Sequence, residues 1–221
     1  QADFLMVESP PLFLCLSAFW LSAIKRARLI FNVSDLWPES AVRLNIIREG
    51  STAHRLSAWL EGVCYRTAWL VSGQSRSILS DIEARFPGKP TFRLSNGVAV
   101  RKFALDTRDP AVRQRIADVP EQIVVLWGGL HGLAQGLAQA VLAAERLRDD
   151  PRIRFVLVGD GPEKAALVAD AAARGLDNIR FLDPVAAADV PPLLYAADIL
   201  LVPLKEFIPG AVPSKLSESM A

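Results

Sequence analysis

The chain has few of the residues from which metal and redox sites are usually built. Its 221 residues include two cysteines and two histidines. Cys15 and Cys64 both lie in apolar helical stretches, so we expect buried thiols in a reducing compartment rather than a disulfide or a metal pair. His54 and His131 cannot form a zinc site by themselves. We therefore predict neither a cofactor nor a metal site.

A strong net charge is also absent. The 25 lysines and arginines nearly balance the 24 aspartates and glutamates, which gives a formal net charge of +1 at pH 7. This balance gives no sign of a nucleic-acid partner. With 51% hydrophobic and 22% charged residues, the composition is that of a globular protein that can bury one large core or two modest ones.

The apolar run at residues 11–24 is too short to span a bilayer. It ends in Lys25, Arg26 and Arg28, and it lacks the basic leader and cleavage site of a signal peptide. Two interpretations stay open. The run is either a buried helix of a parallel α/β domain or an interfacial helix whose basic rim contacts an anionic membrane through residues 11–28. We expect a cytoplasmic protein, either free or peripheral on the inner membrane.

Aliphatic runs and helical patterns alternate along the chain, which is typical of parallel sheets. The expected strands lie at 3–8, 29–33, 68–72, 91–94, 123–127, 153–159, 179–182 and 199–203. We therefore predict an α/β protein with two Rossmann-like, doubly wound domains. The charged segment 101–122, with two prolines, is the expected linker. The predicted domains are then 1–100 and 123–221.

The final segment, PGAVPSKLSESMA, predicts a helix that follows a buried strand. We expect Ser214 to cap this helix and Leu216 and Met220 to face the core. Lys215 and Glu218, three residues apart, share the other face. Ligands of open parallel sheets lie outside the carboxyl ends of the strands, so this pair could hold a phosphate and a ribose. A plain surface ion pair is the alternative.

Two glycine-containing turns follow expected strands. The first, WGGLHG at 127–132, is expected to run directly into a helix whose N-terminal N–H groups face an anion, with a plain tight turn as the alternative. The second, GDGP at 159–162, has two glycines of the dinucleotide fingerprint, but Lys164 replaces the third. This replacement argues against an NAD site.

Six segments together resemble a known family, in the same order along nearly the whole chain. They are FNVSDLWPESAVRL, LSNGVAVRKF, GGLHGLAQGL, VLVGDGPEK, ADILLVPL and PSKLSESMA. The chain is similar to the retaining family 4 glycosyltransferases, in the branch that builds bacterial surface polysaccharides such as O-antigen and capsule. The resemblance implies the GT-B fold, with an acceptor-side domain followed by a donor-binding domain. It also implies metal-independent transfer, and no D-x-D motif occurs here.

The resemblance further implies a donor site for a nucleotide sugar in the second domain, and we expect uridine as its base. The cations that relatives often carry in the first turn are replaced here by Leu130 and Gln135, and a glutamate near the sugar is replaced by Gly210. His131 and Lys215 are then the available positive groups, and Glu218 aligns with the glutamate that binds the ribose. The expected donor-binding residues are Gly129, His131, Gly132, Gln135, Phe181, Leu182, Gly210, Ser214, Lys215 and Glu218.

Asp35 is the ionisable group nearest to the reacting carbon that the resemblance implies. A carboxylate at a strand end could orient or deprotonate a hydroxyl of a lipid-linked or saccharide acceptor. Alternatively, Asp35 caps a turn and Trp37 packs in the domain. We expect each domain to be incomplete in this chain, so a truncated fragment that binds nucleotide sugar without catalysis is the second functional hypothesis.

Overall fold

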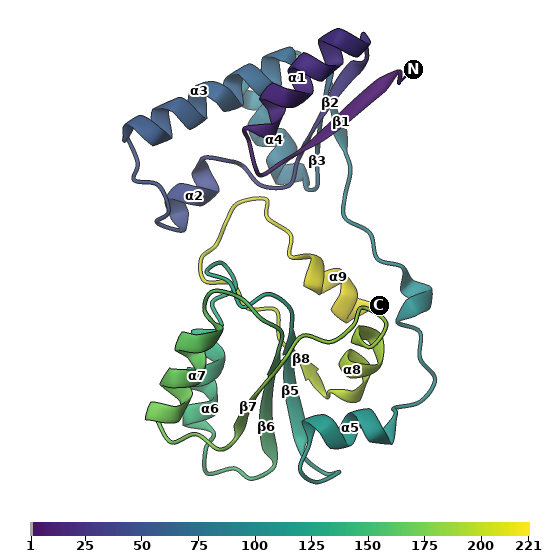
Figure 1. Cartoon of the computed structure of the whole chain (residues 1–221), viewed down its shortest axis with the longest axis vertical. Coiled ribbons are helices and arrows are strands. Elements are labelled where there is room, and N and C mark those ends of the chain that lie inside the picture. Colours follow the sequence, from purple (N-terminus) through teal and green to yellow (C-terminus); the bar gives the residue numbers. More distant parts are fainter. Residues whose placement is uncertain (1) are drawn as a thin grey trace. The chain divides into compact units, whose positions relative to one another are not determined.

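A computed structural model describes residues 2–221, and Gln1 lies outside the described residues. The chain divides into two compact units. The first holds the described residues up to Asn96 together with Phe207–Val212, and the second holds Gly97–Glu206 and Pro213–Ala221. Each unit is built on a four-stranded parallel sheet (Figure 1). The prediction of an α/β protein with two Rossmann-like sheets is therefore confirmed.

In the first unit the strands lie in the order in which they occur along the chain. They are β1 (Phe4–Ser9), β2 (Arg28–Val33), β3 (Leu70–Gly73) and β4 (Thr91–Arg93), and the helices are α1 (Leu14–Lys25), α2 (Glu39–Arg43), α3 (Thr52–Thr67) and α4 (Arg76–Arg85). Side chains that alternate along β2, such as Phe31 and Val33, pack with Tyr65 and Ile82 in one apolar core. Alternation of this kind follows from the pleat of a strand.

Two helices of this unit begin where serine can cap them. The hydroxyl oxygen of Ser51 accepts the N–H of His54, and that of Ser75 accepts the N–H of Ile78. Such caps satisfy backbone donors that have no partner inside the helix. Helices α3 and α4 therefore begin at Thr52 and Arg76, directly after these serines.

Helix α1 is not the buried helix that one interpretation of the sequence predicted. Cys15 and Ala18 are buried, but Phe13, Trp20 and Ile24 are 64%, 66% and 73% exposed. Apolar side chains project from all sides of this helix, but only the narrow face with Cys15 and Ala18 is buried. As predicted, Cys15 and its neighbour in the core, Cys64, are buried free thiols. Among residues 2–221, no helix combines the length and the apolar character needed to cross a bilayer.

The second unit has strand order β7-β6-β5-β8. Its elements are η1 (Val100–Lys102), α5 (Pro110–Ile116), β5 (Ile123–Gly128), α6 (Ala138–Arg146), β6 (Ile153–Val158), α7 (Lys164–Ala173), β7 (Ile179–Leu182), α8 (Val190–Ala196), β8 (Ile199–Leu200) and α9 (Ser214–Met220). Val125 and Trp127 of β5 pack with α6 and α7, whereas Val124 and Leu126 pack with α5 and α8. The sheet is therefore covered on both faces (Figure 1), as continuous aliphatic strands require.

Part of the segment expected to be a linker, 101–122, packs in this second unit. Helix α5 lies inside it, and Ile116 is fully buried. The guanidinium of Arg113 donates to the Ala196 carbonyl and pairs with Asp198 at 2.8 Å. These contacts are made over more than eighty residues of sequence, so the local charge pattern of the segment does not reveal them.

Two predicted boundaries in the second unit are wrong. Helix α6 begins at Ala138 rather than directly after the WGGLHG turn, because Gly136 has a φ of +60°, which no helix continues through. Strand β8 ends at Leu200 rather than at Pro203. The N–H of Leu201 still donates to the Leu126 carbonyl at 2.8 Å, but Pro203 has no N–H with which to extend the ladder further.

Candidate functional site

A pocket of about 330 Å³ lies at the carboxyl ends of strands β5 and β6 in the second unit. Loops after β5, β6 and β7 form it together with α8 and α9. Most lining groups are apolar or glycine: Gly128, Gly129, Leu130, Val158, Gly159, Asp160, Pro184, Val185, Val190, Leu193, Leu194 and Lys215. This is the edge at which open parallel sheets bind ligands.

Two glycines allow the pocket's loops to approach each other closely. Gly129 and Gly159 have φ angles of +156° and +136°. A Cβ atom on Gly159 would lie 1.9 Å from the carbonyl oxygen of Gly129. The N–H of Gly129 donates to the Val158 carbonyl at 2.9 Å. Any side chain at Gly159 would force the two loops apart, so this position requires glycine.

Lys215 supplies the cationic side chain of the pocket's lining. Its Cε lies 3.0 Å from the position that a Cβ of Gly129 would occupy. Its Nζ is 2.7 Å from Oε2 of Glu218. The prediction that these two side chains share one helix face is therefore confirmed, in the form of an ion pair. A role for them in holding a phosphate and a ribose stays a prediction.

The rest of α9 differs from expectation. The helix begins at Ser214, so Pro213 is its N-cap residue and no side chain caps it. Leu216 and Met220, which were expected to face the core, are 44% and 79% exposed. The helix has seven residues and none is buried. Its apolar positions therefore have no core to enter among the described residues.

His131 is not the positive group that the sequence suggested. Its side chain is fully buried. Burial, together with the charge of Lys164, lowers the pKa of the imidazole below its usual value, which leaves the ring neutral at pH 7. The backbone N–H of His131 donates to the Asp160 carbonyl at 2.8 Å, and its backbone carbonyl accepts the N–H of Glu163 at 2.9 Å. His131 thus holds the loop after β5 against the loop after β6.

The remaining residues that were expected to bind the donor lie in different parts of the structure. Gln135 donates its N–H to the Gly132 carbonyl at 3.2 Å, so these two lie together. The side chains of Phe181 and Leu182 pack against the two cores on opposite faces of the sheet. Gly210 has a φ of +81° and lies in Phe207–Val212, outside the second unit.

Sequence reasoning missed most of the apolar lining. Pro184 and Val185 line the pocket two to three residues after Leu182, and the rule that ligands lie beyond strand ends could have indicated them. Leu193 and Leu194 come from α8, where no motif distinguishes a pocket residue from a core residue.

The first unit has a chain of polar side chains at the carboxyl ends of its own strands. The Ser34 hydroxyl donates to Oε1 of Glu8 at 2.5 Å. Gln74 donates to the Ser34 carbonyl, and Asn96 donates to Oε1 of Gln74 at 2.8 Å. Sequence reasoning did not select Glu8, Gln74 or Asn96. Their position immediately at or after strand ends is the signal that could have found them.

Asp35 follows this network directly. Its side chain is half-buried, and burial raises the pKa of the carboxyl group above its usual value. Helix α2, which begins nearby, has Pro38 as its N-cap residue and no side-chain cap, so Asp35 does not cap it. Trp37 packs against the apolar core, as one alternative predicted. Asp35 therefore lies just beyond a strand end, in surroundings that favour its protonated form.

The described residues contain no group of three or more His, Cys, Asp or Glu side chains placed to hold a metal ion.

Comparison with known proteins shows that residues 121–221 match the family described as "Glycosyl transferases group 1". The C-terminal part of the chain is thus similar to this family of glycosyltransferases.

The relatives extend this match over the first unit. The chain is 30% identical over 219 residues to a protein of Escherichia coli K12 named "Putative colanic acid biosynthesis glycosyl transferase WcaI". The alignment covers 96% of this chain and 53% of WcaI. The chain thus spans about half the length of this curated relative.

Solved structures show the same fold. HepE of Anabaena, in complex with UDP and glucose, superposes with a TM-score of 0.71 at 20% identity, over 97% of this chain and 56% of HepE. WaaG, a glycosyltransferase involved in lipopolysaccharide biosynthesis, gives a TM-score of 0.65 at 19% identity, over 92% of this chain and 60% of WaaG. The expected GT-B fold is confirmed by these likenesses.

Proposed function

We propose that this chain is the part of a retaining glycosyltransferase that binds a nucleotide sugar and its acceptor. The reaction moves a sugar from a nucleoside diphosphate, UDP in particular, to a saccharide or lipid-linked acceptor during cell-surface polysaccharide synthesis. The observation that carries the proposal is the position of Lys215 beside the Gly129 loop, in a pocket at the carboxyl ends of β5 and β6. The UDP in HepE and the name of WcaI support the donor and the pathway.

The donor pocket offers two kinds of surface. Its apolar groups, among them Val185 and Leu193, suit the flat face of a nucleobase. Lys215 suits a diphosphate, because an ammonium group donates three hydrogen bonds and charge-assisted bonds are the strongest. Glu218 then accepts hydrogen bonds from the hydroxyl groups of the ribose, and its ion pair keeps the ammonium group of Lys215 in place.

Catalysis in this proposal needs no metal. Asp35 orients or deprotonates the acceptor hydroxyl, and Lys215 stabilises the charge that develops on the departing diphosphate. The raised pKa of Asp35 brings it closer to the pH at which a general base is effective. The remaining rate acceleration comes from holding the two substrates in the correct relative position.

Peripheral contact with a membrane is part of the proposal. The exposed apolar side chains of α1, such as Trp20 and Ile24, lie next to Lys25, Arg26 and Arg28. Apolar side chains that enter the headgroup region and a basic rim that meets anionic lipid are the two requirements of an interfacial helix. A lipid-linked acceptor would be reached from this cytoplasmic surface.

A second function remains open: binding of nucleotide sugar without transfer. The chain covers 53% of WcaI, and the N–H groups of Gly129 and His131 are already used within the protein. Weak donor binding without turnover would follow if the part of WcaI that this chain does not match supplies further contacts.

Isothermal titration of the chain with UDP and UDP-glucose tests the proposal. Lys215→Ala should weaken UDP binding roughly tenfold, because one charge-assisted contact is lost. Lys205→Ala, which removes an exposed cation of the same unit, is the matched control and should leave the affinity unchanged. Unchanged affinity in Lys215→Ala would contradict the assigned site. Binding without sugar transfer would favour the second function, and absence of binding by any nucleotide would refute both.

A further inference from the structure

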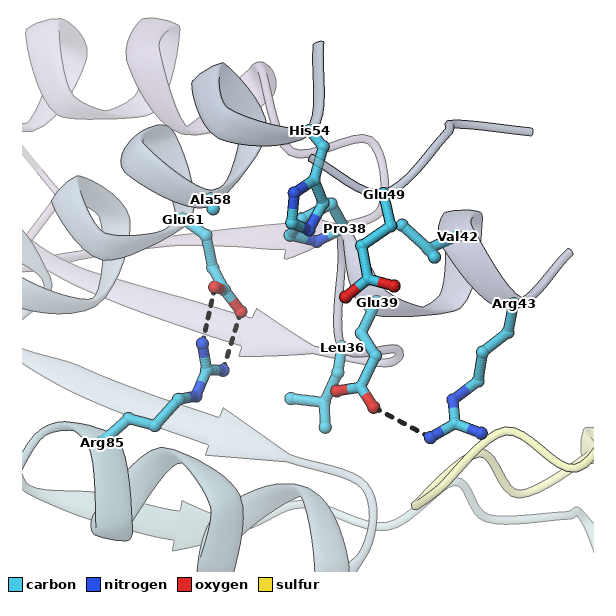
Figure 2. Close-up of a pocket in the computed structure, with 10 residues that line it drawn as sticks. All are labelled: Leu36, Pro38, Glu39, Val42, Arg43, Glu49, His54, Ala58, Glu61 and Arg85. Carbon is cyan, nitrogen blue, oxygen red and sulfur yellow. Dashed lines mark hydrogen bonds and ion pairs between the residues drawn. The ribbon is translucent and has the colours of Figure 1, made fainter. Parts of the chain in front are cut away.

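The first unit contains a pocket of its own, with a volume of about 380 Å³ (Figure 2). It lies among α2, α3, the end of α4 and the loop after β2. Its lining is Leu36, Pro38, Glu39, Val42, Arg43, Glu49, His54, Ala58, Glu61 and Arg85. The volume falls within the range of about 300–1,000 Å³ that is typical of small-molecule sites.

One wall of the pocket is a fixed ion pair. The Arg85 guanidinium donates to both carboxylate oxygens of Glu61 at 2.7 and 2.8 Å, and its Nε donates to Asp81 at 2.7 Å. The Glu61 side chain is only 5% exposed. Arg85 also lies over the rings of Tyr65 and Phe86, 5.6 and 5.7 Å from their centres. This bidentate geometry holds polar groups at set positions in the pocket.

The other end of the pocket gathers Glu39, Glu49 and His54 (Figure 2). Glu39 pairs with Arg43 at 3.1 Å. Glu49 takes part in none of the ion pairs found among residues 2–221. Nδ1 of His54 accepts the Gly50 N–H at 3.3 Å, so a neutral ring carries its proton on Nε2 and can donate it to a ligand.

The charge of the lining indicates which ligands fit. Both arginines are matched by glutamates, and Glu49 remains as an uncompensated carboxylate. An anionic ligand would be repelled by it, whereas a hydroxyl or an ammonium group would bond to it. Leu36, Pro38 and Val42 add apolar surface for the carbon face of a ring. A ring that carries hydroxyl groups meets all of these conditions.

We propose that this pocket binds one sugar unit of the acceptor, and that it takes a neutral or amino sugar and rejects an acidic one. The proposal rests on the proposed function, because it names the class of acceptor on which that reaction would act. Glu49 sets the charge preference, and the Glu61–Arg85 pair with His54 orients the ring through its hydroxyl groups.

The test uses three probes of one shape and different charge: methyl glucosaminide, methyl glucoside and methyl glucuronide. Each is titrated into the whole chain and followed by backbone amide NMR shifts. The amino sugar should bind best and the acidic sugar worst. Glu49→Gln should weaken binding of the glucosaminide about threefold, as expected for one exposed ion pair, and leave the neutral glucoside unchanged. Glu121→Gln, an exposed glutamate of the second unit, is the control.

Ala58→Leu locates the site independently of charge. The added side chain fills space between the two polar ends of the pocket, so it should weaken all three probes at least tenfold while the amide spectrum stays that of a folded protein. Equal affinity for the three probes, or shifts away from α2 and α3, would overturn the proposal, and so would the absence of binding. UDP titrated into the same sample reports on the donor site separately, so either proposal can fail alone.

Discussion

The carboxyl edges of the two sheets are both built from parallel strand ends and the loops that follow them. They differ in the groups that they present to a ligand. The first edge presents side chains: Glu8, Ser34, Gln74 and Asn96 form a hydrogen-bonded chain, with the half-buried Asp35 next to it. The second edge presents glycine backbone and apolar side chains, with Lys215 as its cation. The fold therefore offers a similar position at both sheets, and the residues at the strand ends would decide which ligand fits there.

The largest expected effect concerns the first edge. Asp35→Asn should lower kcat by about 10²–10⁴-fold, because the amide cannot accept the acceptor's proton. UDP affinity should stay unchanged, since Asp35 belongs to the first unit. In the wild type the rate should fall as the pH drops through the raised pKa of Asp35, since a base works only when it is ionised.

A transfer assay across pH, paired with nucleotide titration, measures both effects. Asp106→Asn, at an exposed position, is the control and should retain the wild-type rate. Full activity in Asp35→Asn would remove the catalytic role from the first edge.

Gly159→Ala tests the second edge. A Cβ at this position meets the Gly129 carbonyl oxygen at 1.9 Å, and the φ of +136° is itself unfavourable for alanine. The free energy of unfolding should fall by roughly 3–5 kcal/mol. Gly175→Ala, with a φ of +63° and open space around it, should cost only about 1 kcal/mol. Urea denaturation of both variants makes the comparison, and equal costs would show that the loop contact is unimportant.

Arg85→Ala tests how far the stability of the first unit depends on the ion pair between the buried Glu61 and Arg85. Loss of Arg85 leaves the Glu61 carboxylate buried without its partner. The expected loss in free energy of unfolding is roughly 2–4 kcal/mol, since Arg85 itself is partly exposed. Arg43→Ala, which breaks the exposed pair with Glu39, should cost less than about 1 kcal/mol. Similar costs for the two variants in urea denaturation would contradict a structural role for the buried pair.

The smallest expected effect concerns α1 of the first unit. Trp20 is 66% exposed, so Trp20→Ser should leave folding intact. Its binding to vesicles of phosphatidylcholine and phosphatidylglycerol should fall about fivefold, because an apolar anchor is lost. Vesicle cosedimentation measures the change, and Tyr195→Ser in the second unit is the control. Equal binding by wild type and Trp20→Ser would argue against contact through α1.

The sequence predicted best what local patterns encode. Aliphatic runs located β2, β5, β6 and β7. The spacing of Lys215 and Glu218 gave their shared face. Each of these features depends on residues within a few positions of each other.

Features that depend on distant contacts were not predictable. The neutral state of His131 follows from its burial under the loop after β6. The pairing of Glu61 with Arg85 joins residues that lie on two different helices. The start of α6 depends on the positive φ of Gly136, whose Cβ position lies 2.8 Å from the backbone of Lys205. No local periodicity carries this information.

Hydrogen exchange of the whole chain with and without UDP tests the central claim most directly, namely that the nucleotide binds at the carboxyl edge of the second sheet and not in the first unit. UDP should slow exchange in the loops around Gly129 and Gly159 and in α8 and α9, and leave the segments of the first-unit pocket, 36–43 and 49–61, unchanged. Protection in the first-unit pocket alone, or none in the second unit, would contradict the assignment of the nucleotide site.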